Sequence, residues 1–141
     1  MRVLGTISVY DSKSNIERIA SLAKVSSGQI KKLGTKRKEP DVDSWCYSTS
    51  WHQFNPSSLD EEIYDFLTAH ISLADAITTL ASPSPTIPPC LTLCPVRQNN
   101  DEEFSCFLTH RTMQTISRLG LALEISPAEV MPQAPHWVLR K

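Results

Sequence analysis

The sequence predicts an α+β fold, in which helices pack on one mixed or mostly antiparallel sheet. Three observations support this prediction. Residues 3–10 alternate as a strand does, residues 58–70 carry the apolar stripe of an amphipathic helix, and residues 109–125 have the pattern of a helix, a glycine and a strand. The predicted order is strand, helix, strand, strand, one or two helices, strand, strand, helix and strand. A layer of helices on a single sheet is the simplest arrangement that buries these apolar faces.

The length and the composition predict one domain. The chain has 141 residues, of which 40% are hydrophobic and 21% are charged, as in ordinary folded proteins. We place the domain at residues 1–131 and interpret residues 132–141, which contain Pro132 and Pro135, as an irregular tail. The formal net charge of −1 argues against general binding to nucleic acid or to an anionic membrane.

The sequence also gives expectations for compartment and cofactors. The first residues lack a signal-peptide core, and no apolar run reaches the ~18 residues that span a bilayer, so we expect a cytoplasmic protein without a membrane partner. Cys90 and Cys94 would lie roughly 13 Å apart in a strand, too far for a disulfide. Together with Cys46 and Cys106 they form no C-x-x-C pair. We expect reduced cysteines, no metal and no cofactor.

The first part of the chain predicts a strand, a helix and a short strand. Residues 3–10 have apolar side chains at both odd and even positions, which favours a central strand. Ser14 and Glu17 have the spacing of a capping box and introduce a helical pattern over residues 15–24. Residues 29–33 follow as a possible strand.

Residues 44–51 predict the next strand. Parity places four of its residues on one face: Trp45, Tyr47, Thr49 and Trp51. Before this strand, residues 31–38 carry five positive charges, which we interpret as a solvated hairpin loop. The alternative is a non-catalytic module that binds a ligand or nucleic acid through residues 31–38, Trp45 and Tyr47.

Residues 58–70 predict the clearest helix. Its apolar stripe consists of Leu59, Ile63, Phe66, Leu67 and His70. Asp60, Glu61 and Glu62 occupy the first turn, where the helix dipole favours negative charge. Ser72 and Asp75 have the spacing of a new cap and predict a second helix over residues 73–80.

The last part of the chain predicts a hairpin, a helix and a strand. Residues 90–97 and 103–108 are the hairpin strands, and Pro95 places the first of them at an edge or a bulge. Thr109 is the predicted cap of a helix whose buried stripe is Met113, Ile116 and Leu119. Gly120 is expected to end this helix in a left-handed conformation. The final strand, residues 121–125, is expected to turn Leu121, Leu123 and Ile125 inward.

The sequence contains no recognised catalytic signature. G-x-S-x-G, H-E-x-x-H and paired metal motifs do not occur. Helix capping and solvation explain the acids of residues 60–65 more simply than acid–base chemistry does. We therefore predict that the protein is not an enzyme.

Several motifs resemble one bacterial family. They are V-S-S-G-Q-I-K-K-L-G-T-K-R, the strand around S-W-C-Y-S, S-S-L-D-E-E-I-Y-D-F-L, and the closing L-T-H-R-T-M-Q-T-I-S-R-L-G-L-A-L-E-I. Over residues 3–126 the chain resembles the family called domain of unknown function 4279. It departs from the acidic-aromatic ending of that family at Ser126-Pro127-Ala128. The resemblance implies a cytoplasmic immunity protein that binds a secreted bacterial toxin domain and covers its active site.

An immunity protein is expected to present acids and aromatic residues to the toxin. The first candidates are Glu61, Tyr64 and Asp65, on the exposed face of the helix over residues 58–70. Further candidates are Asp101, Glu102 and Glu103 at the hairpin tip, and Trp137 in the tail. An ADP-ribosyltransferase, a nuclease or a deaminase toxin would each fit an acidic partner.

Overall fold

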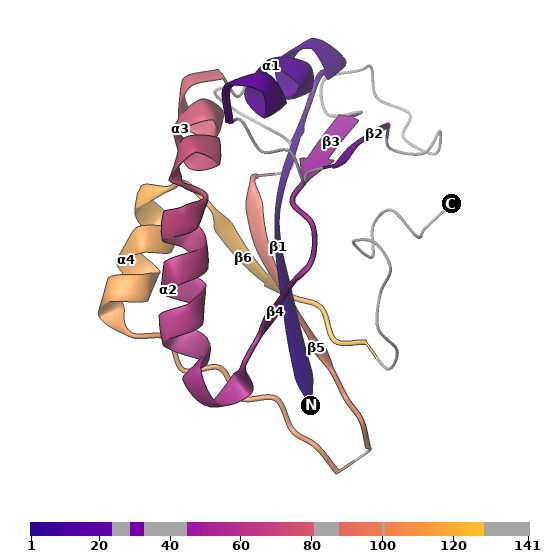
Figure 1. Cartoon of the computed structure of the whole chain (residues 1–141), viewed down its shortest axis with the longest axis vertical. Coiled ribbons are helices and arrows are strands. Elements are labelled where there is room, and N and C mark those ends of the chain that lie inside the picture. Colours follow the sequence, from indigo (N-terminus) through magenta and orange to yellow (C-terminus); the bar gives the residue numbers. More distant parts are fainter. Residues whose placement is uncertain (24–28, 33–44, 81–87, 100, 129–141) are drawn as a thin grey trace.

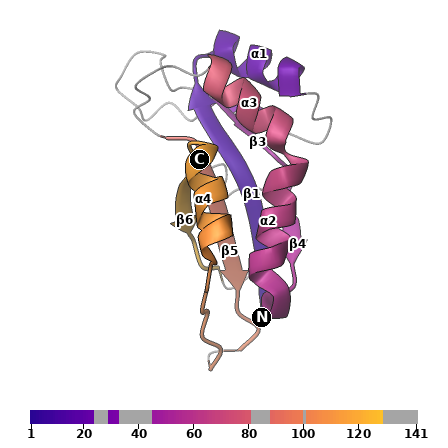
Figure 2. The ribbon, with the colours of Figure 1, turned by 90° about the vertical axis from the view of Figure 1, so that its left-hand side faces the viewer.

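The computed structural model describes residues 1–23, 29–32, 45–80, 88–99 and 101–128. Within these residues, helices cover one face of a single open, mixed sheet (Figure 1; Figure 2), which confirms the predicted α+β class. Trp137 and the rest of residues 129–141 lie outside the described part of the chain, as do residues 33–44 with most of the basic run. None of the described helices is long and apolar enough to cross a bilayer.

Strand β1 (Arg2–Asp11) lies at the centre of the sheet, as its apolar residues on both faces predicted. On one side it pairs antiparallel with β5 (Cys90–Val96). On the other side it pairs first with β3 (Trp45–Ser48) and then with β4 (His52–Phe54). The outer strands of the described sheet are β2 (Gln29–Lys32), beside β3, and β6 (Ala122–Ile125), parallel to β5.

The strand predicted over residues 44–51 is interrupted by a bulge. Ser8 lies opposite Ser48 whereas Val3 lies opposite Phe54, so five steps along β1 match six steps on the partner. At the bulge, the Thr49 hydroxyl accepts the N–H of Ile7 at 3.0 Å. The extra residue reverses the parity, so the predicted single aromatic face is wrong. Tyr47 lies in the main core, whereas Trp51 packs on the opposite side of the sheet.

Four α-helices pack against the sheet in the described structure. They are α1 (Lys13–Ala23), α2 (Leu59–Ala69), α3 (Ile71–Leu80) and α4 (His110–Arg118), with a 3₁₀ turn, η1 (Pro56–Ser58), before α2. The second predicted helix begins at Ile71, two residues before its predicted start at residue 73. Only His70 separates it from the end of α2 at Ala69. Ser72, the predicted cap, instead donates a hydrogen bond to the carbonyl of Ala23 in α1.

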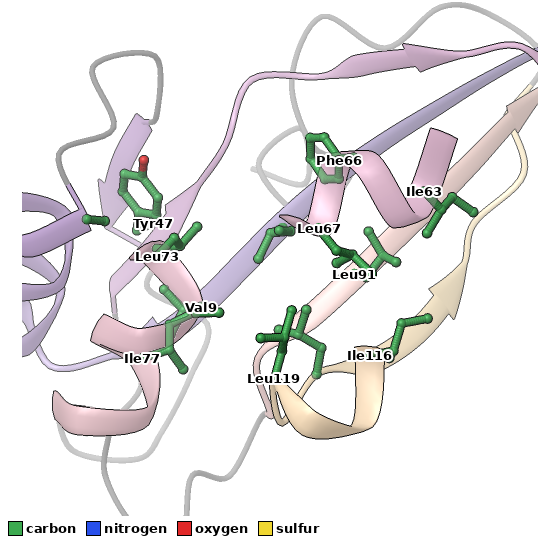
Figure 3. Close-up of a cluster of buried hydrophobic side chains, with 14 of the residues drawn as sticks. Val9, Tyr47, Ile63, Phe66, Leu67, Leu73, Ile77, Leu91, Ile116 and Leu119 are labelled. Atoms are coloured by element: carbon green, nitrogen blue, oxygen red, sulfur yellow. The ribbon is translucent and has the colours of Figure 1, made fainter. Parts of the chain in front are cut away.

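The core lies between the helices and the sheet. Figure 3 shows side chains from several elements meeting there, among them Val9 and Leu91 from the sheet and Leu67 and Leu73 from the helices. Each of these side chains is at most 1% exposed. The apolar stripe predicted for residues 58–70 therefore does cover the sheet, and α2 is held with its acidic side outward.

The predicted hairpin of residues 90–97 and 103–108 does not form. Residues 103–108 belong to no strand, because β6 occupies the edge of β5 that they would have used. Parallel strands need a crossover connection, and α4 provides it. β5 is therefore an internal strand. Pro95 lies in a gap of this pairing: the β5–β6 ladder stops at Leu93 and resumes only at an isolated parallel bridge between Val96 and Ala128. The gap tolerates the missing N–H of Pro95, whose carbonyl accepts the N–H of Ala128 at 3.0 Å.

The end of α4 follows the prediction. Gly120 has φ of 68°, and its N–H donates to the carbonyl of Ser117 at 3.0 Å. The N–H of Leu121 donates to the carbonyl of Ile116 at 3.1 Å, which completes a Schellman cap. This tight reversal lays β6 antiparallel to α4 and brings the two elements side by side at the edge of the molecule (Figure 2).

Candidate protein-binding surfaces

The first turns of α2 and α4 are joined by Asp60. Its carboxylate accepts the N–H of Thr109 at 2.7 Å and the Thr109 hydroxyl at 3.0 Å. Burial alone would raise the pKa of Asp60, but these hydrogen bonds, one from Thr112 and the charge of Arg111 outweigh it and lower the pKa. Asp60 is therefore a structural residue that fixes α4 beside α2.

This junction places Arg111 of α4 against Tyr64 of α2. The Arg111 guanidinium carbon lies 3.9 Å from the centre of the Tyr64 ring, which is a cation–π contact. Tyr64 is half-buried, while Glu61 and Asp65 beside it are exposed. We call Glu61, Tyr64, Asp65 and Arg111 the α2–α4 patch. The sequence predicted the first three from their spacing on one helix. It carries no signal for Arg111, which belongs to α4 and follows Asp65 by 46 residues (111 − 65).

The predicted acids after β5 are not part of this patch. The Glu102 carboxylate accepts a hydrogen bond from the N-terminal ammonium of Met1 at 3.0 Å and another from the N–H of Gln98 at 2.8 Å. The hydrogen bond from Gln98, followed by the hydrogen bond and the positive charge of the N-terminus, lowers the pKa of Glu102. Asp101 and Glu103 are exposed. Glu102 thus has a structural role at the connection, where it binds the N-terminus and the backbone of Gln98.

The aromatic platform of the alternative, nucleic-acid-binding interpretation is not formed. Tyr47 is 1% exposed and lies in the core, so its ring cannot stack on a base. Burial raises the pKa of Tyr47 to about 12. Trp45 is half-buried, with the Lys13 ammonium 5.1 Å from its ring centre. The side chains of Lys31 and Lys32 and all of residues 33–38 lie outside the described part of the chain.

A second surface lies between α4, β6 and the segment before α4. It is an apolar groove of about 650 Å³, with no charged residue in its lining. The lining residues are Cys106, Phe107, Leu108, Met113, Ile116, Ser117, Leu121, Leu123 and Ile125. Four of them are among the six exposed large apolar residues of the described chain: Phe107 at 85%, Met113 at 57%, Leu123 at 41% and Ile125 at 46%.

Sequence reasoning missed this groove because its residues look like core residues. Met113, Leu123 and Ile125 were predicted to be buried, and the structure contradicts all three predictions. Their neighbours on the same stripes, Ile116 and Leu121, are each 7% exposed. The apolar stripes of α4 and β6 are therefore wider than the core that they cover. A contiguous exposed apolar patch of this kind is typical of an interaction site.

The outer edge of β6 is open beside the groove. The N–H groups of Ala122, Ser126 and Ala128 donate toward β5 or the residue before it, to Pro89, Leu93 and Pro95 respectively. By the alternation of a parallel strand, the N–H and C=O groups of Leu123 and Ile125 point away from β5. No described strand pairs with them. Pro127, at the next outward position, has no N–H, so the open edge ends after Ile125.

The four cysteines are free, with Cys46, Cys90 and Cys94 buried and Cys106 in the groove wall. Within the described residues, no three His, Cys, Asp or Glu side chains are grouped as a metal site would require. Comparison with known proteins finds no family model, no curated protein and no solved structure that matches the chain. The family resemblance and the immunity function that it implies therefore stay predictions.

Proposed function

We propose that the chain is a non-catalytic binding protein that neutralises a bacterial toxin domain, and that the α2–α4 patch contacts the toxin. The nature of the partner rests on the family resemblance. The choice of surface rests on one observation, the stacking of Arg111 on Tyr64 at 3.9 Å on a helix that also exposes Glu61 and Asp65.

This arrangement suits recognition of another protein. Tyrosine and arginine are the residue types most enriched at binding hot spots. The contact with Arg111 holds the Tyr64 ring in place before binding, so less side-chain freedom is lost when a partner arrives. Glu61 and Asp65 add negative charge, which would speed association with the basic substrate cleft of a toxin that binds nucleic acid or a nucleotide.

The test begins with the tagged chain as bait in its bacterial host. A toxin domain should be recovered in equal amount with the chain, and its activity should be blocked when the two are mixed. Recovery of no toxin, or of one that stays active at saturation, would overturn the proposal.

The surface is tested on the same complex. Replacing Glu61, Tyr64 and Asp65 together by Ala should weaken toxin binding by about 100-fold or more, because it removes an aromatic anchor and two charges. The matched control is Glu17→Ala with Asp75→Ala, two exposed acids on α1 and α3, which should leave the affinity unchanged. Equal affinity of the triple variant and the control would assign the toxin to another surface.

A further inference from the structure

We infer that the apolar groove and the open edge of β6 form an interface between two copies of this chain. The two β6 strands would pair antiparallel about a twofold axis and join the two sheets into one. This inference does not depend on the proposed function, because it uses the opposite side of α4 from the α2–α4 patch.

The backbone of β6 is suited to pairing with itself. The backbone N–H and C=O groups of Leu123 and Ile125 point outward. They alternate with the N–H and C=O groups of Ala122 and Glu124, which point toward β5. In an antiparallel pair, outward-pointing residues must lie opposite one another to exchange hydrogen bonds. An axis at Leu123 meets this condition, because Leu123 then faces its own copy. Next to it, the carbonyl of Leu121 can accept the N–H of Ile125 of the second copy, while the Leu121 N–H stays bonded to Ile116.

Charge selects this register over the next one. With the axis at Leu123, Glu124 of each copy lies opposite Ala122 of the other. An axis at Glu124 would place two carboxylates directly opposite each other, which destabilises a strand pair. Apart from Glu124, β6 has no charged residue, and charged residues are the usual means by which natural edge strands avoid pairing.

The side chains of such a pair would close the groove. Cross-strand partners point to the same face of a sheet, so both copies would present Leu121, Leu123 and Ile125 to the helical side. The two α4 helices would then flank one shared apolar layer, with Phe107 and Met113 of each copy at its border. Leu123 and Ile125, which the isolated chain leaves exposed, would each gain an apolar neighbour from the other copy.

The size of the surface is also appropriate. Four apolar side chains that are 41–85% exposed present on the order of 400 Å² of apolar surface. A stable interface takes about 800 Å² from each partner, of which somewhat more than half is apolar. The groove thus supplies roughly the apolar share of such an interface, and the strand edges and rim supply its polar share.

Sedimentation of the full chain tests the inference. The wild-type chain should have twice the 15.8 kDa mass of one chain. Leu123→Lys places a charge on the edge and should weaken association by about 100-fold or more. Leu22→Lys, on α1, changes another exposed leucine in the same way and should leave the dimer intact, and circular dichroism should show all three proteins folded.

Two results would overturn the inference: a wild-type chain that stays monomeric at its highest soluble concentration, or a Leu123→Lys chain that associates as the wild type does. A monomeric wild type would assign the groove to a segment of a different protein or to a small apolar ligand.

A cross-linking experiment tests the register. In a Cys106→Ser background, Leu123→Cys should form a disulfide-linked dimer, because the paired Cα atoms would lie about 5.5 Å apart. Ile125→Cys should not, because the two copies of residue 125 would lie roughly 13 Å apart along the strands. Equal cross-linking by both variants would contradict an axis at Leu123.

Discussion

At the scale of single residues, Gly5 controls how β4 packs on β1. A Cβ atom at Gly5 would overlap Cε2 of the Phe54 ring and lie 2.9 Å from its Cζ. The ring has little freedom to move, since Phe54 is 1% exposed and packs edge-on against Phe66 with ring centres 5.5 Å apart. Gly5 is therefore needed for its missing side chain, at a point where an aromatic ring crosses the central strand.

Gly5→Ala should lower the free energy of unfolding by about 2 kcal/mol, the typical cost of overpacking a core. Urea denaturation measures the loss. Phe54→Leu removes the ring atoms that the new methyl group meets, so Gly5→Ala should cost much less in that background. An equal cost in both backgrounds would show that the methyl group does not meet Phe54.

At the scale of elements, α4 depends on a carboxylate from another helix. Thr109 occupies the N-cap position, but its side chain makes no hydrogen bond to the α4 backbone. Its hydroxyl and its N–H both donate to Asp60 in α2 instead. Asp60 thus anchors the start of α4, and with it Arg111 of the α2–α4 patch and Met113 of the groove.

Asp60→Ala should lower the free energy of unfolding by about 1 kcal/mol at neutral pH, as loss of a helix cap does. The pKa of Asp60 is lower in the folded chain than its ordinary value of 3.8. Its contribution is therefore present above that value and is lost as the pH falls through the lower, folded-state pKa. Urea denaturation of both proteins from neutral to acidic pH should show the difference shrinking in acid, and a constant difference would exclude this role.

The sequence predicts the features that depend on residues close together in the chain, and it misses those that depend on distant segments. The alternation of residues 3–10, the stripe of α2 and the stop at Gly120 are local patterns. The strand, the helix and the helix end that they predict all appear in the structure. The pairing of β5 is set by competition between two distant segments, residues 103–108 and β6, and no local pattern decides it. The bulge at Thr49 also depends on a partner, since it is held by Ile7 and Thr6 of β1.

The same distinction applies to the candidate surfaces. Glu61, Tyr64 and Asp65 are visible in the sequence because they share one helical face, whereas Arg111 reaches them only through packing. The spacing of apolar residues would be the same whether Met113, Leu123 and Ile125 faced a core within the chain or a core shared with a second copy. Periodicity shows that these side chains need an apolar neighbour, but it does not show which chain supplies that neighbour.

At the scale of the whole molecule, α4 separates the two surfaces. Arg111 faces α2, whereas Met113 and Ser117 face the groove. Pairing through β6 would place the two α4 helices at the centre of the dimer and the two α2–α4 patches on its outer flanks. Each patch would remain open, so the dimer would hold two toxin domains at independent sites.

This arrangement predicts a stoichiometry. Sedimentation of the wild-type complex should give a particle with two chains and two toxin domains, whereas Leu123→Lys should give one of each. Titration calorimetry should find the same affinity per site for both proteins, because Leu123 does not contribute to the patch. If the toxin instead dissociated the wild-type dimer, or if Leu123→Lys weakened toxin binding, the toxin would occupy the groove, and the α2–α4 patch would lose its proposed role.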